Sequence, residues 1–414
     1  MNQPFDLILY GATGYTGRLV AEELLRQQHA NKLTFRWALA GRNPAKLERV
    51  RDELTAIDLR AQQLPIVVAD SSDARSLERL VQQTRVVCTT VGPYMQHGGL
   101  LIEACADHGV HYCDLTGEVP FIRRAIDDLH ERAQKNEARI VPCCGFDSIP
   151  SDLGWLELSQ HLKKQSILFD EIRFFLMKSR GGLSGGTIAS MAGLFERGLD
   201  KGLRRLLFNP VALNPDPSLK SDQPFDQRSP RLDSSIGAWT APFLMEGINT
   251  RVVRRSQALM QESFRYSESM RTGKGPLGWL RASALTLFIG TAIGLFSNRL
   301  TRPMFRRLLP KPGDGPTQRQ REAGLFVISL LAMNTGGSTT KTVGRINITC
   351  DQDPGYGATA KMLASSALCL ALDEEQLPVR FGILTPASAM GSTLTKRLES
   401  QGIHFTLEAD KNVA

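Results

Sequence analysis

Three glycines, each three residues apart, stand near the start of the chain, directly after an apolar segment. Residues 5–10 read Phe-Asp-Leu-Ile-Leu-Tyr, residues 11–17 read Gly-Ala-Thr-Gly-Tyr-Thr-Gly, and an amphipathic stretch begins at Leu19. A strand, a glycine-rich turn and a helix start in this order present backbone N–H groups to the pyrophosphate of a dinucleotide. The spacing is weak by itself, but the flanking elements support it. We therefore predict a dinucleotide site at Gly11, Ala12, Thr13, Gly14, Tyr15, Thr16 and Gly17.

The residues after the next apolar segment indicate which dinucleotide is bound. Residues 37–40, Trp-Ala-Leu-Ala, are followed by Gly41, Arg42 and Asn43. An NAD site commonly has Asp or Glu here for the ribose 2′-hydroxyl, whereas a guanidinium suits a 2′-phosphate. Arg42 and Asn43 therefore predict NADP(H), with a solvated surface arginine as the competing interpretation.

Polar residues follow the later apolar segments of this region in the same way. Parallel strands expose their carboxyl ends at one edge of the sheet, and ligands bind at that edge. The residues at the ends of segments 65–69, 85–91 and 110–113, or directly after them, are therefore predicted to contact the cofactor. They are Asp70, Ser71, Val91, Gly92, Pro93, Tyr94 and Asp114.

Two further loops are expected to meet the substrate. Residues 143–152 follow the apolar segment 138–142 and open a helical stretch, and residues 181–187 connect a predicted strand to a predicted helix. Glycines in such a loop let a ligand approach the backbone. Helix capping is the competing interpretation for the polar residues of the first loop. The predicted substrate contacts are Cys144, Asp147, Ser148, Gly185, Gly186 and Thr187.

These residues require an alternating arrangement of strands and helices. Apolar strand patterns lie at 5–10, 34–40, 65–69, 85–91, 110–113 and 138–142, with helical patterns at 15–28, 44–56, 73–83, 97–108 and 119–136. Alternation of this kind predicts an α/β fold, a Rossmann-type doubly wound parallel sheet.

After Pro150 the pattern changes and predicts a second, α+β domain with a mixed or antiparallel sheet. Residues 323–333 and 339–350 read as a hairpin, and residues 209–235 form a proline-rich excursion. We expect residues 1–150 to form the NADP-binding domain, completed by the C-terminal segment 355–414. Residues 151–354 would form the substrate or association domain.

Charge and cysteine usage narrow the class of protein. The net charge of +8 arises within 271–311, which holds eight basic and no acidic residues. Such local basicity does not indicate a nucleic-acid partner. Seven scattered cysteines without a C-x-x-C pair indicate a reducing, cytoplasmic setting. Cys105, His108, His111 and Cys113 lack the usual spacing of a zinc site, so we expect no metal.

The apolar segment 280–298, uncharged from Ala282 onward, has three interpretations. It is a buried helix of the second domain, a helix lying on an anionic membrane, or a membrane span. Its basic flanks favour peripheral contact through 271–311, which would place the protein on the inner face of the membrane. A span is the weakest interpretation because hydroxyl residues dilute the apolarity.

The motifs together resemble the saccharopine dehydrogenase-like oxidoreductases over nearly the whole chain. The matching residues are Gly-Ala-Thr-Gly-Tyr-Thr-Gly at 11–17, Ala-Gly-Arg-Asn at 40–43, Val-Gly-Pro-Tyr at 91–94, His-Tyr-Cys-Asp-Leu-Thr-Gly-Glu at 111–118, Gly-Phe-Asp-Ser-Ile-Pro-Ser-Asp at 145–152, Asp-Pro-Gly-Tyr at 353–356 and Leu-Thr-Pro-Ala-Ser-Ala-Met-Gly at 384–391. The subgroup that the chain resembles includes the mycobacterial trans-acting enoyl reductases.

The resemblance implies an NADP(H)-dependent oxidoreductase that reduces a hydrophobic acyl or enoyl substrate, free or bound to a carrier. It implies that Tyr94 and Asp147, the positions matching the family's substrate-side tyrosine and aspartate, are the catalytic candidates. A saccharopine-type amino-acid dehydrogenase is the first alternative, although the loop at 181–187 has only Arg180 as a nearby cation. A non-enzymatic, NADP-bound protein associated with membrane or lipid is the second. The oligomeric state stays open, with a homodimer as one candidate.

Overall fold

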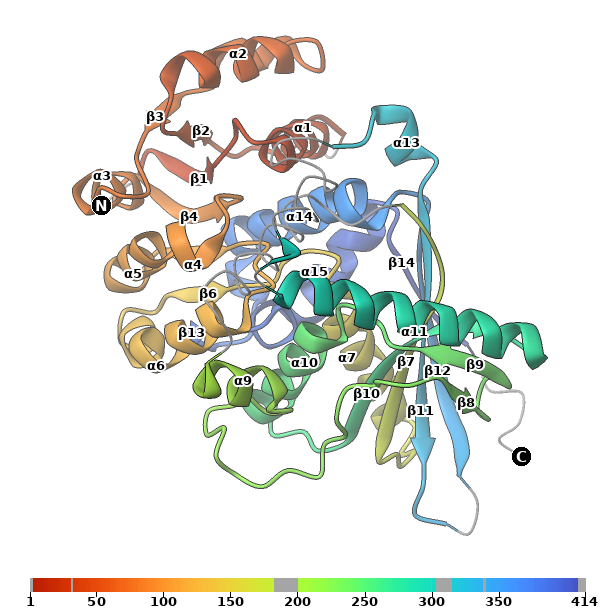
Figure 1. Ribbon diagram of the computed structural model, residues 1–414. Coiled ribbons are helices and arrows are strands. Elements are labelled where there is room, and N and C mark those ends of the chain that lie inside the picture. Colours follow the sequence, from red (N-terminus) through yellow and green to blue (C-terminus); the bar gives the residue numbers. More distant parts are fainter. Residues whose placement is uncertain are drawn as a thin grey trace.

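The computed structural model describes residues 3–30, 33–181, 200–298, 300–302, 315–337 and 340–408. Two sheets of seven strands each organise the molecule. Figure 1 shows the first sheet with the N-terminal half of the chain and the second sheet on the opposite side of the molecule. One continuous apolar cluster contains residues of both halves, so the two sheets share a core.

The first sheet is parallel throughout and has the strand order β13-β6-β5-β4-β1-β2-β3. The order reverses next to β1, which is where open α/β sheets bind their ligands. This confirms the predicted Rossmann-type sheet. Its strands are β1 (Phe5–Tyr10), β2 (Trp37–Gly41), β3 (Ile66–Val68), β4 (Thr84–Thr89), β5 (His111–Cys113), β6 (Arg139–Val141) and β13 (Gly382–Ile383).

The crossover segments between these strands are helical, as the alternating pattern predicted. They are α1 (Tyr15–Ala30), α2 (Pro44–Leu54), the 3₁₀ turn η1 (Leu59–Gln63), α3 (Ala74–Val81), α4 (Tyr94–His97), α5 (Gly99–His108) and α6 (Val119–Lys135).

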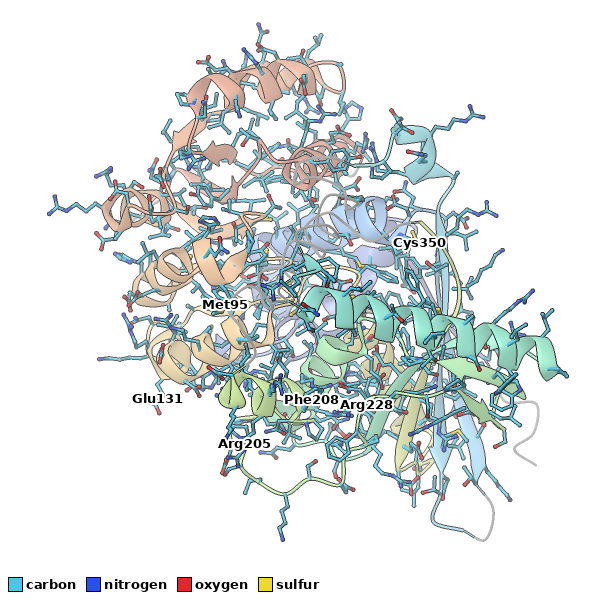
Figure 2. The ribbon with its side chains drawn as sticks, viewed as in Figure 1. Met95, Glu131, Arg205, Phe208, Arg228 and Cys350 are labelled. Carbon is cyan, nitrogen blue, oxygen red and sulfur yellow. The ribbon has the colours of Figure 1, made fainter. Side chains whose placement is uncertain are left out.

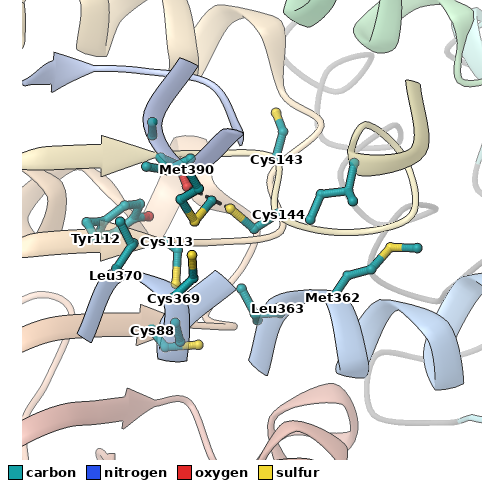
Figure 3. Packing of buried hydrophobic residues seen from close by; sticks show 14 of the residues in the cluster. Cys88, Tyr112, Cys113, Cys143, Cys144, Met362, Leu363, Cys369, Leu370 and Met390 are labelled. Carbon is teal, nitrogen blue, oxygen red and sulfur yellow. Dashed lines mark hydrogen bonds between the residues drawn. The ribbon is translucent and has the colours of Figure 1, made fainter. Parts of the chain in front are cut away.

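A helix from the far end of the chain completes the packing of the first sheet. Helix α14 (Thr359–Leu372) contacts α1, β4 and β5, and the Gln27 amide donates to Ser365 Oγ at 3.3 Å. Figure 3 shows Cys369 of α14 close to Cys88 and Cys113 of the strands. All seven cysteines are buried free thiols, which agrees with the expected absence of a disulfide framework.

The second sheet is mixed, with the order β14-β12-β11-β7-β10-β9-β8. Only β7 and β10 pair in parallel, and every other neighbouring pair is antiparallel. The predicted hairpin is β11–β12. The strands are β7 (Glu171–Arg180), β8 (Arg231–Asp233), β9 (Ala238–Ala241), β10 (Arg265–Gly273), β11 (Leu325–Asn334), β12 (Lys341–Cys350) and β14 (His404–Glu408).

Helices cover this sheet and join it to the first one. Helix α7 packs against β11, β12, α10 and α15. The C-terminal segment divides between the sheets, because β13 lies beside β6 whereas β14 pairs with β12. The remaining elements are α7 (Ile149–Lys164), α9 (Lys201–Phe208), α10 (Glu246–Met260), α11 (Gly275–Ser297), α13 (Gln318–Glu322), the π-helical turn η2 (Pro354–Ala358), the 3₁₀ turn η3 (Glu374–Gln376) and α15 (Pro386–Ser400).

Buried arginines hold the proline-rich excursion against α10. The guanidinium of Arg254 donates to the carbonyls of Pro210, Pro224 and Tyr266 at 2.8–2.9 Å. Arg255 donates to the Leu213 carbonyl at 2.6 Å. At the surface, Arg228 lies over the Phe208 ring at 4.8 Å (Figure 2). The excursion is therefore fixed by backbone carbonyls accepting from inward-facing side chains.

The apolar segment forms α11, which packs along β9 and β10. Of its residues only Gly278 and Ala282 are buried. The interpretation of this segment as a buried core helix was therefore wrong. In the part of the chain that the structure describes, α11 is the one helix long and apolar enough to cross a membrane by length and composition.

Candidate functional site

The turn between β1 and α1 needs its glycines for close packing. Gly11 has φ +96°, and a Cβ there would lie 2.7 Å from Val91 Cγ2. A Cβ on Gly17 would lie 2.1 Å from the Gly11 carbonyl oxygen. Both distances are shorter than any side chain tolerates, so the turn keeps its shape only with glycine at these positions.

The same turn leaves backbone donors pointing out of the helix start. Gly11 N–H donates to the Ala40 carbonyl at 2.9 Å, and Gly14 N–H to the Gly11 carbonyl at 3.0 Å. The helix ladder opens with Arg18 N–H, which donates to the Gly14 carbonyl at 2.9 Å. The N–H groups of Tyr15, Thr16 and Gly17 precede that bond, in the position where helix termini bind phosphate.

The Tyr15 side chain connects this turn to distant parts of the chain. Its hydroxyl donates to the Pro316 carbonyl and accepts from the Arg321 guanidinium, the latter at 2.6 Å. Its ring meets the Tyr356 ring edge-on, with centroids 4.9 Å apart. Sequence reasoning placed Tyr15 in the cofactor turn but did not foresee Arg321, which lies more than 300 residues further along the chain.

Arg42 and Asn43 follow β2 at the same sheet edge. The Asn43 side chain caps α2, because its Oδ1 accepts from Lys46 N–H at 3.0 Å. Arg42 is exposed, and its charge acts to lower the pKa of both Asp70 and Tyr10 slightly.

Two further predicted or neighbouring residues at this edge have shifted pKa values. Asp70 accepts from the backbone and hydroxyl of Ser72, and these bonds lower the pKa of its carboxyl. Burial raises the pKa of Tyr10 to about 12, although a hydrogen bond with the half-buried Ser71 acts to lower it.

Tyr94 begins α4 after Val91, Gly92 and Pro93, and its hydroxyl is enclosed by the protein. It donates to the Thr89 carbonyl at 3.3 Å and accepts from Leu115 N–H at 3.2 Å. Burial, followed by the charge of Asp114, raises the pKa of Tyr94 well above its usual value. The Glu118 carboxylate accepts from Tyr94 N–H and Met95 N–H at 2.9 Å each. The bonds to Glu118 position the loop. The two hydrogen bonds of the hydroxyl, together with its raised pKa, leave it poorly placed to give up a proton.

Asp114 joins the ends of β5 and β6. Its carboxyl accepts from the Tyr112 hydroxyl at 2.6 Å, Thr116 N–H at 2.9 Å and Cys143 N–H at 3.1 Å. It is fully buried, and desolvation raises its pKa to about 7. Because its carboxyl already accepts three hydrogen bonds from the protein, Asp114 stabilises the loops at this edge and is not free to contact a ligand.

Asp147 lies in the loop between β6 and α7 and differs from Asp114 in its exposure and in its hydrogen bonds. It is half-buried, and burial raises the pKa of its carboxyl to about 6. Unlike the Asp114 carboxyl, it has no hydrogen bond or ion pair in the described parts of the chain. Cys143, at the start of the loop, has φ +65°, a strained backbone conformation for a side chain of this kind.

The neighbours of Asp147 face the protein interior. Cys144 is fully buried, and its thiol donates to the Val141 carbonyl at 3.3 Å. Ser148 Oγ donates to Asn249 Oδ1 at 3.3 Å, and the Asn249 amide donates to the Glu268 carboxyl at 2.9 Å. Asn249 and Glu268 belong to α10 and β10, which the sequence analysis did not recognise. Gly185, Gly186 and Thr187 lie outside the described residues.

The arrangement fits a dinucleotide carrying a 2′-phosphate. The crowded glycines bring backbone close to the edge of the sheet, the α1 N-terminus offers donors for a pyrophosphate, and Arg42 stands at the end of β2. The predicted cofactor residues are therefore brought to one edge, although Asn43, Tyr94 and Asp114 already bond to the protein there. Among the described residues no cluster of His, Cys, Asp or Glu could hold a metal.

Comparison with known proteins agrees with this geometry. Residues 7–141 match the saccharopine dehydrogenase NADP-binding domain. The chain is 38% identical to a trans-acting enoyl reductase of Mycobacterium bovis over 96% of both chains. It is 37% identical to one of Mycobacterium leprae, again over 96% of both.

A solved structure supports the fold alone. Saccharopine dehydrogenase from Saccharomyces cerevisiae superposes with a TM-score of 0.53 at 10% identity, covering 97% of this chain and 99% of the other. The full-length similarity to the curated relatives and the NADP-binding domain together establish the family. The chain belongs to the saccharopine dehydrogenase-like oxidoreductases and carries their NADP-binding domain at residues 7–141.

Proposed function

We propose that the protein is an NADPH-dependent reductase that saturates the carbon–carbon double bond of a hydrophobic acyl substrate, free or carried on a partner protein. The observation that supports this most is Asp147, a half-buried carboxyl with a pKa of about 6 at the ligand edge of the nucleotide-binding sheet. The trans-acting enoyl reductases of mycobacteria are similar over almost the whole chain.

The first domain would hold the cofactor. The N–H groups of Tyr15, Thr16 and Gly17 would bind the pyrophosphate, and Arg42 would pair with the 2′-phosphate. When bound, NADPH supplies a hydride, and reduction of a double bond needs a proton in addition.

The Asp147 carboxyl would supply that proton. With a pKa of about 6 it exchanges protons near neutral pH, which suits a general acid. The Tyr94 hydroxyl is less suitable, because the Leu115 N–H and the Thr89 carbonyl already occupy it. Tyr94 would act instead by holding the β4–α4 loop against the Asp114 loop.

The arginines near the site favour an uncharged substrate over an amino acid, whose carboxylate would need a free cation. Carboxylates are commonly held by guanidinium groups. The three fully buried arginines of α10, Arg251, Arg254 and Arg255, all donate to protein oxygens. Arg180, at the end of β7, is exposed. This favours an acyl substrate over a saccharopine-type one.

The test combines a substrate choice with a carboxyl variant. The wild-type protein should oxidise NADPH in the presence of a long-chain 2-enoyl thioester. Asp147→Asn should lower kcat by about 100- to 10,000-fold with a smaller change in KM. The wild-type rate should fall as the pH rises through about 6, since the acid must be protonated. Asp128→Asn, which removes an exposed carboxylate on α6, is the matched control and should retain activity.

Other results would decide against the proposal. Turnover of a 2-oxo acid with an amine, but of no enoyl thioester, would indicate an amino-acid dehydrogenase. An Asp147→Asn variant with full activity would exclude this carboxyl as the proton donor. Tight NADPH binding with no turnover of either substrate class would indicate a non-enzymatic protein.

A further inference from the structure

Helix α11 presents an unusually large apolar surface. Six of its apolar side chains are between 45% and 71% exposed, and we call them the α11 surface: Leu277, Trp279, Leu280, Leu287, Phe288 and Ile293. Single exposed apolar residues are ordinary, but six on one helix form a large apolar surface of the kind that often marks a site of association. Figure 1 shows α11 running along the outside of the second sheet.

Two of the four hydroxyl side chains of α11, and carbonyls at its end, are bonded within the chain. Thr286 Oγ1 donates to the Ala282 carbonyl at 2.8 Å, and Ser297 Oγ donates to the Ile293 carbonyl at 2.7 Å. At the helix end, Arg302 Nε donates to the Phe296 carbonyl at 2.9 Å, and Thr301 Oγ1 donates to the Leu295 carbonyl at 2.7 Å. These internal bonds lower the cost of moving this part of the helix out of water.

Charge indicates what covers this surface. The window 271–311 holds eight basic residues and no acidic one, with Lys274 directly before α11 and Arg281 in its second turn. A second copy of the chain would bring the same positive charge against itself if it met this surface. An anionic lipid surface complements both the apolar helix and its basic flanks.

The connections of α11 fix how it would meet a bilayer. At its start, Thr272 Oγ1 donates to the Gly278 carbonyl at 2.9 Å, which ties the helix to β10. Beyond its end, the Pro316 carbonyl accepts from Tyr15 in the first domain. The start of α11 and the chain at Pro316 are therefore both held by the folded body. A span would force residues 298–315, with their arginines, back across the hydrocarbon layer, which is costly.

We propose that the α11 surface docks the protein on the anionic face of a membrane, with the helix lying in the interfacial layer. Trp279 would lie at the lipid–water boundary, where tryptophan is favoured. Vesicle binding requires no catalysis, so this inference stands apart from the proposed reaction.

Vesicle sedimentation tests the proposal with the full chain. Wild-type protein should bind phosphatidylcholine vesicles that contain phosphatidylglycerol at least about tenfold more tightly than pure phosphatidylcholine vesicles, and less tightly as salt rises. Leu287→Glu combined with Phe288→Glu should lower binding to the anionic vesicles by about tenfold or more. Leu168→Glu combined with Val379→Glu is the matched control. It adds the same charge at side chains 79% and 92% exposed outside α11, and it should bind as wild type does.

Three outcomes would overturn the proposal. The first is no binding of the wild type to anionic vesicles. The second is equal loss in the control variant. The third is a dimer, seen by sedimentation without lipid, that the Leu287→Glu and Phe288→Glu changes dissociate, with no vesicle binding. That result would assign the α11 surface to a second copy of the chain. Unchanged melting temperatures of both variants would confirm that each is folded.

Discussion

Asp114 and Asp147 follow neighbouring strands of the first sheet, and burial raises the pKa of both. In the sequence they look alike, since each is an aspartate after an apolar segment. In three dimensions Asp114 accepts three hydrogen bonds, whereas none to Asp147 is found among the described residues. The sequence pattern predicted the sheet edge correctly. Which of the two carboxyls is bonded by the protein depends on the direction of the neighbouring N–H groups, which the pattern does not contain.

Arg42 should decide the cofactor. In Arg42→Ala we expect the Kd for NADPH to rise about 10- to 100-fold, because one charge-assisted contact to the 2′-phosphate is lost. The Kd for NADH should change little. Fluorescence titration with both dinucleotides measures this.

Arg49→Ala is the control for Arg42→Ala, since it removes an exposed guanidinium from the neighbouring helix α2. If Arg42→Ala weakens both dinucleotides equally, or if the wild type prefers NADH, the assignment of Arg42 to the 2′-phosphate is wrong.

Helix α10 shows why the second domain was harder to predict. An ordinary helix places charged residues outside, but Arg251, Arg254 and Arg255 of α10 are about 1% exposed. Their inward position hides the amphipathic pattern on which helix prediction depends. Conversely, α1 and α6 have apolar inner faces, and their predicted bounds agree with the structure to within a few residues. Strands β8 and β9 are too short to give a pattern.

Arg254 should be a major stabilising residue of the excursion. Arg254→Met leaves the carbonyls of Pro210, Pro224 and Tyr266 without their donor. We expect the free energy of unfolding to fall by about 3 kcal/mol or more, as when one partner of a buried charged network is removed. Urea denaturation measures the change.

Arg204→Met on the exposed surface of α9 is the comparison for Arg254→Met, and it should change stability by less than about 0.5 kcal/mol. Equal effects of the two substitutions would show that the buried network contributes nothing specific.

Among the described residues of the whole molecule, five buried or half-buried carboxyls have their pKa values raised into the range of about 6 to 9. Desolvation raises the pKa of Asp147 and Asp152 to about 6, of Glu268 to about 7 and of Glu246 to about 9. Asp114 belongs to the same set, with a pKa of about 7. The folded state therefore holds more protons than the unfolded chain at neutral pH. His130, whose pKa burial lowers to about 4, acts in the opposite sense below its unfolded value of 6.5.

These shifts predict a protein that loses stability as the solution becomes alkaline. A raised carboxyl pKa contributes stability below its unfolded value, and that contribution is lost as the pH rises through the folded value. Above pH 6.5 His130 no longer offsets this loss. The melting temperature should therefore fall between about pH 6.5 and 8.5. Glu268→Gln should flatten the decline, and a melting temperature that rises over this range would contradict the account.

The position of α14 has a consequence for how the protein is made. This helix covers the first sheet beside α1 and β4, yet it consists of residues 359–372. During translation, strands β1 to β6 of the first sheet leave the ribosome long before α14 is synthesised, and β13 follows after α14. Until α14 is made, one apolar face of the nascent sheet is exposed to solvent. Partly folded chains with such exposed surface bind chaperones or aggregate. The sheet that carries the dinucleotide site is therefore completed only near the end of synthesis, because α14 and β13 both come from about the last 60 residues of the chain.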